Sequence, residues 1–337
     1  MRQRWAAFLL FIFVFYSVSF RASSVSCVQE SSLSDDLTPP RYSEMNAGYF
    51  TESSPINIDS NQDLETFSSS GTGTQEDPYV IERLHIVATG TQNSSISVFY
   101  TSDFFVIRDC YLETDWACID IRHTAVGTVG IENNTCISNS GDGAGIVAWA
   151  ARNCTIVGNR CTNLAQGIHL NEAACCHIAS NNVTSNSYQG INIRYSNYNT
   201  ITENRITSSS QHGVALVGTS RFNVIHHNYF MNNGVEETYR IDGEERGELT
   251  SQAFDEGSSN TWYDAAAEEG NWWSDYSGTG SYLIDGPSNS TDMYPIADDE
   301  PQPLALDPML IAVTIAGIGG ALILLAWASK RFRRGGN

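Results

Sequence analysis

Lysine is nearly absent from this sequence of 337 residues, and basic residues are scarce throughout. The single lysine, Lys330, lies close to the C-terminus, and Lys and Arg together number 18 against 38 Asp and Glu. Residues 23–308 hold all 38 acidic residues but only 11 basic ones, which gives that segment a formal charge of −27. Such an acidic surface repels phosphate backbones, so we expect no nucleic-acid partner.

Residues 96–234, the most regular part of the sequence, contain little leucine and no run of apolar residues at helical spacing. That stretch holds four leucines against fifteen isoleucines and ten valines. The low leucine content argues against leucine-rich repeats, and no run of 10–12 residues has the apolar spacing of a helix. β-Branched residues separated by Gly, Asn and Ser favour short strands joined by tight turns instead.

A repeat of 22–27 residues organises this stretch. The glycines that mark it most clearly are Gly145, Gly167, Gly190 and Gly213, and each precedes an alternating apolar pair such as Ile191 and Ile193. An asparagine recurs later in each unit, at Asn159, Asn181, Asn204 and Asn228. We therefore predict an all-β fold, a right-handed single-stranded parallel β-helix whose coils stack about 4.8 Å apart. Ile191 then lies between Ile168 and Val214, and the asparagines form a ladder at an external or corner position.

Composition divides the rest of the chain into caps, a stalk and membrane-targeting segments. In order, we predict a signal peptide (1–22), an N-terminal cap with the first coil (45–95), β-helix repeats (96–234), a C-terminal cap with an aromatic-rich closing motif (235–299), a stalk (300–308), a transmembrane helix (309–328) and a basic tail (329–337). The closing tryptophans and tyrosines read as a hydrophobic plug over the open end of the helix, with ligand stacking as the alternative.

Residues 309–328 are twenty uncharged, mostly apolar residues, enough to span a bilayer, and Lys330 and three arginines follow. By the positive-inside rule the tail is cytoplasmic, so we expect a single-pass protein with its β-helix outside the cell. The first 22 residues have the charge and apolar run of a secretory signal, with an uncleaved anchor as the alternative. The oligomeric state is not indicated.

The eight cysteines do not form a simple disulfide framework. Cys154 and Cys176 share one column of the predicted coils, and Cys136 and Cys161 share another. Stacked positions have parallel Cβ vectors, which suits a disulfide poorly, so we interpret most cysteines as small buried hydrophobes. Bridges within these two pairs stay open for an extracellular protein.

The motifs "GTGTQEDPYVI" (71–81) and "GNWWSDYSGTGSYLIDG" (270–286), with the repeats between them, resemble a known family. Over roughly residues 45–298 the chain is similar to NosD-like secreted β-helix proteins of archaeal type, whose repeats belong to the carbohydrate-binding and sugar-hydrolase (CASH) class. The resemblance implies a pectate-lyase-like solenoid outside the membrane. It also implies a link to the maturation of a copper enzyme, without fixing an activity.

Recognisable catalytic and metal-binding patterns are missing from the coils. "SGDGAG" (140–145) and "QHG" (211–213) are only fragments of glycosidase signatures, and the acidic pairs of β-helix hydrolases do not occur. We read Asp142 and His212 as a turn acid and a corner residue. His226 and His227 are adjacent, so in a strand they would point to opposite faces, and we predict no copper site there. No cofactor is expected, with calcium as an open alternative.

Two outward columns on consecutive coils form what we call the candidate face. The first column reads Ser97, Asp120, Val147, His169, Asn192 and Ala215, and the second reads Phe99, Arg122, Trp149, Asn171, Arg194 and Val217. An exposed tryptophan offers a stacking surface, and planar guanidinium and amide groups offer directional hydrogen bonds. The predicted ligand-binding set is therefore Trp149, Arg122, Arg194, His169, Asn171, Asn192 and Asp120. The alternatives are an ordinary solvated face and a Trp149 covered by the segment after Gly234.

These features favour a non-catalytic cell-surface protein that binds glycans or builds the envelope. Two alternatives stay open. The first is a polysaccharide lyase or glycoside hydrolase of the β-helix class, and the second is an accessory factor for the maturation of an extracytoplasmic copper enzyme.

Overall fold

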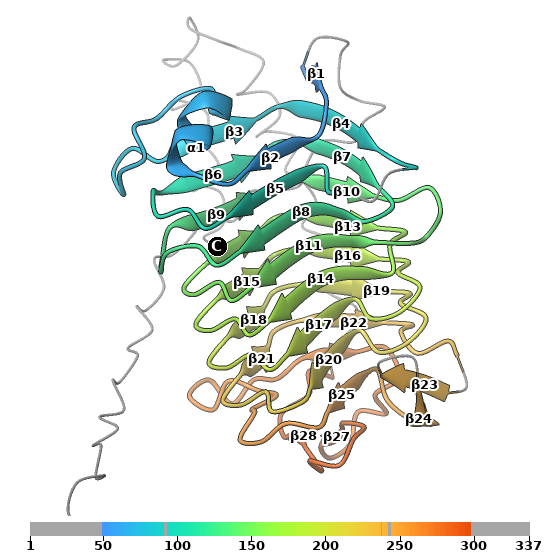
Figure 1. The fold of residues 1–337 in the computed structure, drawn as a ribbon. Helices are drawn as coiled ribbons and strands as arrows, with labels where there is room; N and C mark the ends of the chain where they lie inside the picture. The colour runs from blue at the N-terminus through green and yellow to red at the C-terminus, as the bar shows by residue number, and fades with distance from the viewer. Residues whose placement is uncertain (1–48, 91–92, 237, 242–243, 298–337) are drawn as a thin grey trace, which may run out of the picture. The chain divides into compact units, whose positions relative to one another are not determined.

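A computed structural model describes residues 49–90, 93–236, 238–241 and 244–297. Three parallel sheets make up most of this structure, and strands that follow one another along the chain join the sheets in rotation (Figure 1). The predicted fold is confirmed as a parallel β-helix of the right-handed type. Sequence analysis predicted short strands but not that a full coil carries three of them.

The nine-stranded sheet contains β1 (Thr51–Ser53), β4 (Leu84–Ala88), β7 (Tyr111–Thr114), β10 (Thr135–Ile137), β13 (Arg160–Thr162), β16 (Asn182–Thr184), β19 (Arg205–Thr207), β22 (Tyr229–Met231) and β26 (Trp272–Trp273). The eight-stranded sheet contains β2 (Ile56–Ile58), β5 (Ile96–Phe99), β8 (Ala117–Arg122), β11 (Ala144–Trp149), β14 (Gln166–Asn171), β17 (Ile191–Arg194), β20 (Val214–Val217) and β25 (Ala253–Asp255). The seven-stranded sheet contains β3 (Tyr79–Glu82), β6 (Phe105–Arg108), β9 (Val129–Glu132), β12 (Thr155–Val157), β15 (His177–Ala179), β18 (Thr200–Thr202) and β21 (Val224–His226).

Two antiparallel pairs and one helix complete the described elements. The pairs are β23 (Thr238–Ile241) with β24 (Glu244–Glu248), and β27 (Tyr282–Leu283) with β28 (Thr291–Asp292). Helix α1 (Asn61–Phe67) begins after Ser60, whose hydroxyl accepts a hydrogen bond from the backbone N–H of Asp63. Its Leu64 is fully buried and belongs to the core, so this helix covers the first coils.

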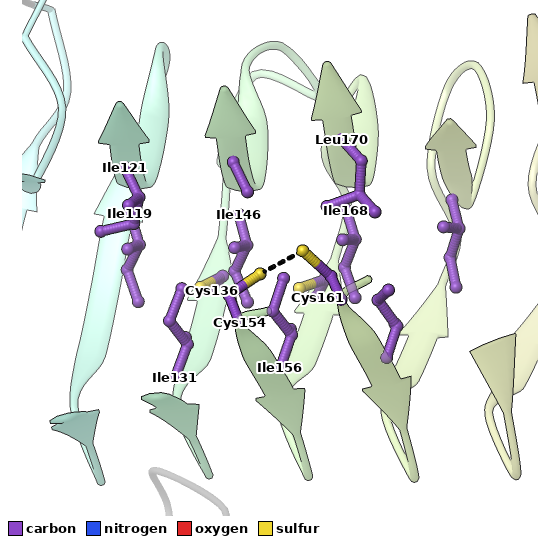
Figure 2. Packing of buried hydrophobic residues seen from close by; sticks show 14 of the residues in the cluster. Ile119, Ile121, Ile131, Cys136, Ile146, Cys154, Ile156, Cys161, Ile168 and Leu170 are labelled. Carbon is purple, nitrogen blue, oxygen red and sulfur yellow. Dashed lines mark hydrogen bonds between the residues drawn. The ribbon is translucent and has the colours of Figure 1, made fainter. Parts of the chain in front are cut away.

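Columns of β-branched side chains fill the interior. Ile191 pairs in register with Ile168 and with Val214, and none of the three side chains is exposed. The predicted register is therefore confirmed. Figure 2 shows the same stacking for the neighbouring coils, where Ile119, Ile146 and Ile168 follow one another across the sheet.

The predicted cysteine columns are present and hold thiols. Cys136 and Cys161 pair in register, and the Sγ atom of Cys154 lies 2.7 Å from that of Cys176 (Figure 2). All four are free and buried, as are Cys110 and Cys118, which confirms their interpretation as small core residues. Cys175 is disulfide-bonded.

The asparagine ladder lies inside a corner of the coil and not on its outside, because each amide is needed to satisfy buried backbone groups. Nδ2 of Asn181 donates to Oδ1 of Asn204 at 2.9 Å and to the carbonyl of Ile156 at 2.9 Å. The backbone N–H of Asn181 donates to the same Oδ1 at 3.0 Å. The pattern joins one coil to the next through Asn134, Asn159, Asn181, Asn204, Asn228 and Asn271, all of them buried.

The C-terminal cap continues the sheets beyond Gly234 and then plugs the end. Strand β25 pairs with β20, and β26 pairs with β22. Trp273 stacks between Phe230 and Tyr282, with both centroid separations 4.1 Å, and Trp262 is fully buried beside it. Trp262, Trp273 and Tyr282 belong to the hydrophobic core at this end of the solenoid, as the plug interpretation expects.

The predicted signal peptide, stalk, transmembrane helix and tail lie outside the described residues. All described strands belong to one compact unit that ends at Ile296. Among the described residues, no helix is long and apolar enough to cross a membrane.

Candidate functional site

The outer face of the eight-stranded sheet brings the predicted residues together. In the second column Trp149 pairs in register with Arg122 on β8 and with Asn171 on β14, and Asn171 pairs with Arg194 on β17. In the first column Asp120, Val147, His169 and Asn192 succeed one another in the same way. The seven predicted residues therefore occupy four consecutive strands of one face, which follows from the period-two alternation of side chains.

Arg122 holds the aromatic part of this face in place. Its guanidinium lies 5.3 Å from the ring centroid of Phe99 and 5.3 Å from that of Trp149, so the cation is sandwiched between two aromatic rings. Its Nε and Nη2 atoms donate to the two carboxylate oxygens of Asp120 at 2.9 and 2.7 Å. This bidentate pair raises the pKa of Arg122 and fixes its plane.

This arrangement differs from the role that the sequence suggested for Arg122 and Asp120. Asp120 is buried, only 2% exposed, and both of its oxygens accept from Arg122. The guanidinium therefore has its bidentate partner within the protein. We assign Arg122 to positioning Trp149, whose side chain is partly exposed.

Among the described residues, three polar side chains of the candidate face have buried atoms without a hydrogen-bond partner. They are Nε2 of His169, Oδ1 of Asn171 and Oδ1 of Asn192. Burial, reinforced by the Arg194 cation, lowers the pKa of His169 to about 4, so its imidazole is neutral at physiological pH. A buried polar atom left unsatisfied costs about 1–3 kcal/mol, so the position of three together on one face points to a polar ligand or to water.

The C-terminal segment bounds the candidate face at one end. Tyr239, on the β23–β24 hairpin, packs with Ala215, Val217 and Phe254 in a small cluster of buried apolar residues. Figure 1 shows this hairpin beside β20 and β25 at the C-terminal end of the sheet. Strand β20 is three strands away from β11, which carries Trp149. The described part of this segment therefore packs at a distance from Trp149, which argues against the alternative that it covers the tryptophan.

Comparison with known proteins identifies the family. The sequence profile described as "Periplasmic copper-binding protein (NosD)" matches residues 49–278, which is more than half of the chain. The chain belongs to the NosD family. A search of curated proteins finds no match to this NosD-family chain.

Solved structures that are similar to this chain have low sequence identity to it. An alginate lyase from Paenibacillus sp. str. FPU-7 is 14% identical, with a TM-score of 0.32, over 61% of this chain and 68% of that chain. The periplasmic alginate epimerase AlgG is 14% identical, with a TM-score of 0.35, over 64% of this chain and 69% of that chain. Likenesses this weak say nothing about activity.

His212, part of the "QHG" fragment, has a structural environment in this NosD-family chain. It is 1% exposed, its Nε2 atom lies 3.1 Å from Oδ2 of Asp285, and its ring packs against Tyr239 and Phe254. Asp285 also accepts hydrogen bonds from the backbone N–H groups of Thr250 and Ser251. The pair therefore ties β20 to the C-terminal cap. Sequence analysis missed Asp285 because it lies 73 residues further along the chain.

Proposed function

We propose that this NosD-family chain is a membrane-anchored cell-surface protein whose extracellular β-helix binds an extended neutral or acidic glycan on the candidate face without catalysis. One observation carries the proposal. Trp149 is partly exposed and held by Arg122, and the same face carries three buried polar atoms that have no hydrogen-bond partner among the described residues. A stacking plate next to unsatisfied hydrogen-bonding groups is what a sugar requires, because its ring carries both apolar C–H faces and hydroxyls.

The spacing of the face suits a repeating ligand. Consecutive strands of a sheet lie about 4.8 Å apart, near the length of one sugar ring, so side chains on neighbouring coils can contact neighbouring sugars. Trp149 would stack on one ring, and Asn171 and Asn192, one and two coils further on, would bond the hydroxyls of the following rings. The neutral imidazole of His169 can donate through one nitrogen and accept through the other.

The cellular location is part of the same proposal. It is supported by the apolar run at residues 309–328, the basic residues that follow it and the signal-like N-terminus. An extracellular glycan is the ligand that a protein in that position meets.

A glycan array probed with the full-length protein tests the proposal. Trp149→Ala should keep the melting temperature and lose affinity by on the order of 1–3 kcal/mol, with aromatic stacking on nucleic-acid bases as the guide. Trp116→Ala is the matched control, because Trp116 is an exposed tryptophan outside the two columns of the candidate face. Absence of any glycan ligand, or equal affinity loss in both variants, would refute the binding role. A fall in stability for Trp149→Ala with unchanged affinity would assign Trp149 to packing.

Activity and metal-binding assays of the same full-length protein distinguish this proposal from its two alternatives. Turnover of acidic polysaccharides that depends on calcium would favour a lyase or hydrolase. Stoichiometric copper binding would favour the accessory role in copper-enzyme maturation, in line with the description of the NosD family.

A further inference from the structure

Five Asn-x-Ser/Thr triplets, the acceptor motif for N-linked glycosylation, occur in the sequence. Their asparagines are Asn93, Asn133, Asn153, Asn182 and Asn289. Repeats rich in Asn and Thr produce such triplets by chance, so the structure has to decide which of them an enzyme can use. Modification of the folded protein requires an exposed asparagine amide, an accessible hydroxyl two residues later and a backbone segment that is not held between two strands.

The hydroxyls of the first two triplets are buried. Ser95, which completes the Asn93 triplet, is fully buried, and its Oγ donates to a backbone carbonyl of β7 at 3.2 Å. Thr135, which completes the Asn133 triplet, is 8% exposed and lies on β10 between β7 and β13. An enzyme that recognises the hydroxyl cannot reach either of them once the solenoid has folded.

The next two triplets belong to central strands of the sheets. Thr155 follows Asn153 on β12, which pairs with β9 and β15 on its two sides. Asn182 is exposed, but it begins β16, which pairs with β13 and β19. The hydroxyl of its Thr184 lies 2.8 Å from that of Thr207. Lifting either strand out would break the parallel ladder on both sides, so these segments open only when their coils unfold.

The fifth triplet lies in the loop between β27 and β28, at the C-terminal end of the solenoid (Figure 1). Asn289 is exposed and has a left-handed backbone with a φ of 52°. The serines on both sides of it face the protein. The hydroxyl of Ser288 donates to the carbonyl of Gly257 at 2.7 Å. That of Ser290 donates to the carboxylate of Asp255, also at 2.7 Å. These two bonds hold the loop on the cap and leave the amide between them in solvent.

Both reacting groups of this triplet are lightly held. Nδ2 of Asn289 donates a 3.3 Å hydrogen bond to the carbonyl of Pro287. Thr291 is partly exposed, and its hydroxyl donates at 3.3 Å to the sulfur of Met293, a weak acceptor. Its strand β28 forms a two-stranded sheet with β27, outside the three sheets of the solenoid. Of the five triplets, this one alone offers its amide and its hydroxyl without opening a solenoid sheet.

We propose that Asn289 is the N-glycosylation site of this chain. The inference rests on the extracellular location proposed above, because such glycans are attached on the outer side of a membrane. The donor is a glycan joined through its anomeric carbon to a polyprenyl phosphate or diphosphate. Nδ2 of Asn289 forms a bond to the anomeric carbon, the carbon–oxygen bond breaks with its electron pair on the leaving phosphate, and the amide releases one proton to solvent.

A glycan at Asn289 would shield the C-terminal end of the solenoid. The eight-stranded sheet ends at β25, where Phe254 forms one further parallel bridge to Asp285, four residues before Asn289. The edge of a sheet can pair with another chain unless something covers it. A bulky, hydrated sugar on the adjoining loop hinders end-to-end pairing of two solenoids, and it lies on a different part of the chain from the candidate face.

Glycopeptide mass spectrometry of the full-length protein from its native host tests the site. The peptide that contains Asn289 should carry a glycan. Asn289→Asp removes the reacting nitrogen but tolerates the left-handed backbone, and Thr291→Val removes the hydroxyl, so both should abolish the modification. Thr291→Ser restores the hydroxyl and should retain the glycan. Ser290→Ala is the matched control, because it changes the residue between the two reacting groups and leaves both in place.

An unmodified Asn289 in the wild-type protein, a glycan that persists in Thr291→Val, or a glycan on any of the other four triplets would overturn the proposal. Protease added to intact cells tests the location separately. A digested ectodomain with unmodified Asn289 would refute the glycosylation alone, whereas a protected and unmodified ectodomain would refute the extracellular location as well. Binding of Asn289→Asp on the glycan array should match that of the wild type, so the candidate face is tested independently.

Discussion

The carboxylate of Asp292 accepts a 3.0 Å hydrogen bond from the indole Nε1–H of Trp273. The same oxygen accepts from the backbone N–H of Asn271 at 2.7 Å and from its Nδ2 at 3.2 Å. One buried acid thus ends the asparagine ladder and fixes the aromatic plug. A carboxylate suits this place because it only accepts, and every group that faces this oxygen is a donor.

Asp292→Asn should therefore destabilise the protein although it barely changes the volume. The new NH₂ group cannot accept, so in one orientation of the amide the donors on Asn271 and Trp273 lose their acceptor, and in the other the backbone N–H of Tyr294 does. Each buried donor left unsatisfied costs about 1–3 kcal/mol. Chemical denaturation measures the change. Asp142→Asn, at an exposed turn, should stay within about 0.5 kcal/mol of wild type, and an equal effect of both substitutions would contradict this role for Asp292.

Ile191→Asp should unfold or severely destabilise the solenoid. The aspartate would stand between Ile168 and Val214 in a column without exposure, where a charge has no partner. Ile191→Val is the conservative comparison and should cost about 0.5–1.5 kcal/mol. Thermal and urea unfolding measure both variants, and a wild-type melting temperature for Ile191→Asp would reject the stacking register.

Asn204→Ala should interrupt the asparagine ladder in the middle of the solenoid. It removes the acceptor of the Asn181 backbone N–H and the donor to the carbonyl of Ile178, and each buried group left alone costs about 1–3 kcal/mol. Asn182→Ala, one residue from the ladder and exposed, serves as the control and should be nearly neutral. Similar unfolding free energies for the two variants would show that the ladder contributes little.

His212→Gln should make the protein less sensitive to mild acid. Burial lowers the pKa of His212, partly offset by Asp285, so the unfolded chain takes up a proton at a higher pH than the folded one. Stability therefore falls as the pH drops below about 6.5, the ordinary pKa of histidine. Unfolding free energies at pH 7.5 and 5.5 should differ less in His212→Gln than in wild type. His123→Gln, at an exposed position, should keep the wild-type difference, and an unchanged difference in His212→Gln would exclude His212 as its source.

The repeat made the fold predictable, since a fixed period determines which residues share a column. Ile168, Ile191 and Val214 could be stacked from the sequence alone. The contact of Arg122 with Asp120 could also be predicted from the sequence, because residues two apart in a strand share a face. We missed it by treating every outward residue as available to a ligand.

Other features depend on information that the repeat does not hold. The contact between the rings of His226 and His227 depends on the left-handed backbone conformation of His227. The sequence has no glycine at that position to indicate such a turn. Asp285 and Asp292 lie in the C-terminal cap, beyond the last repeat. The repeat spacing therefore does not predict their hydrogen-bond partners, His212 and Trp273. The asparagine ladder is buried at a corner because each coil has three strands. The spacing of the glycines does not reveal that number of strands.

The asparagine ladder also makes internal coils interchangeable. Each amide presents an oxygen to the coil before it and an NH₂ group to the coil after it, so any two internal coils meet through the same contact. A gene for such a chain can gain or lose a whole coil without redesigning the neighbours, while the helix-covered start and the Asp292 end must be kept. Descendants of one ancestor can thus differ in length by whole coils and present binding faces of different extent.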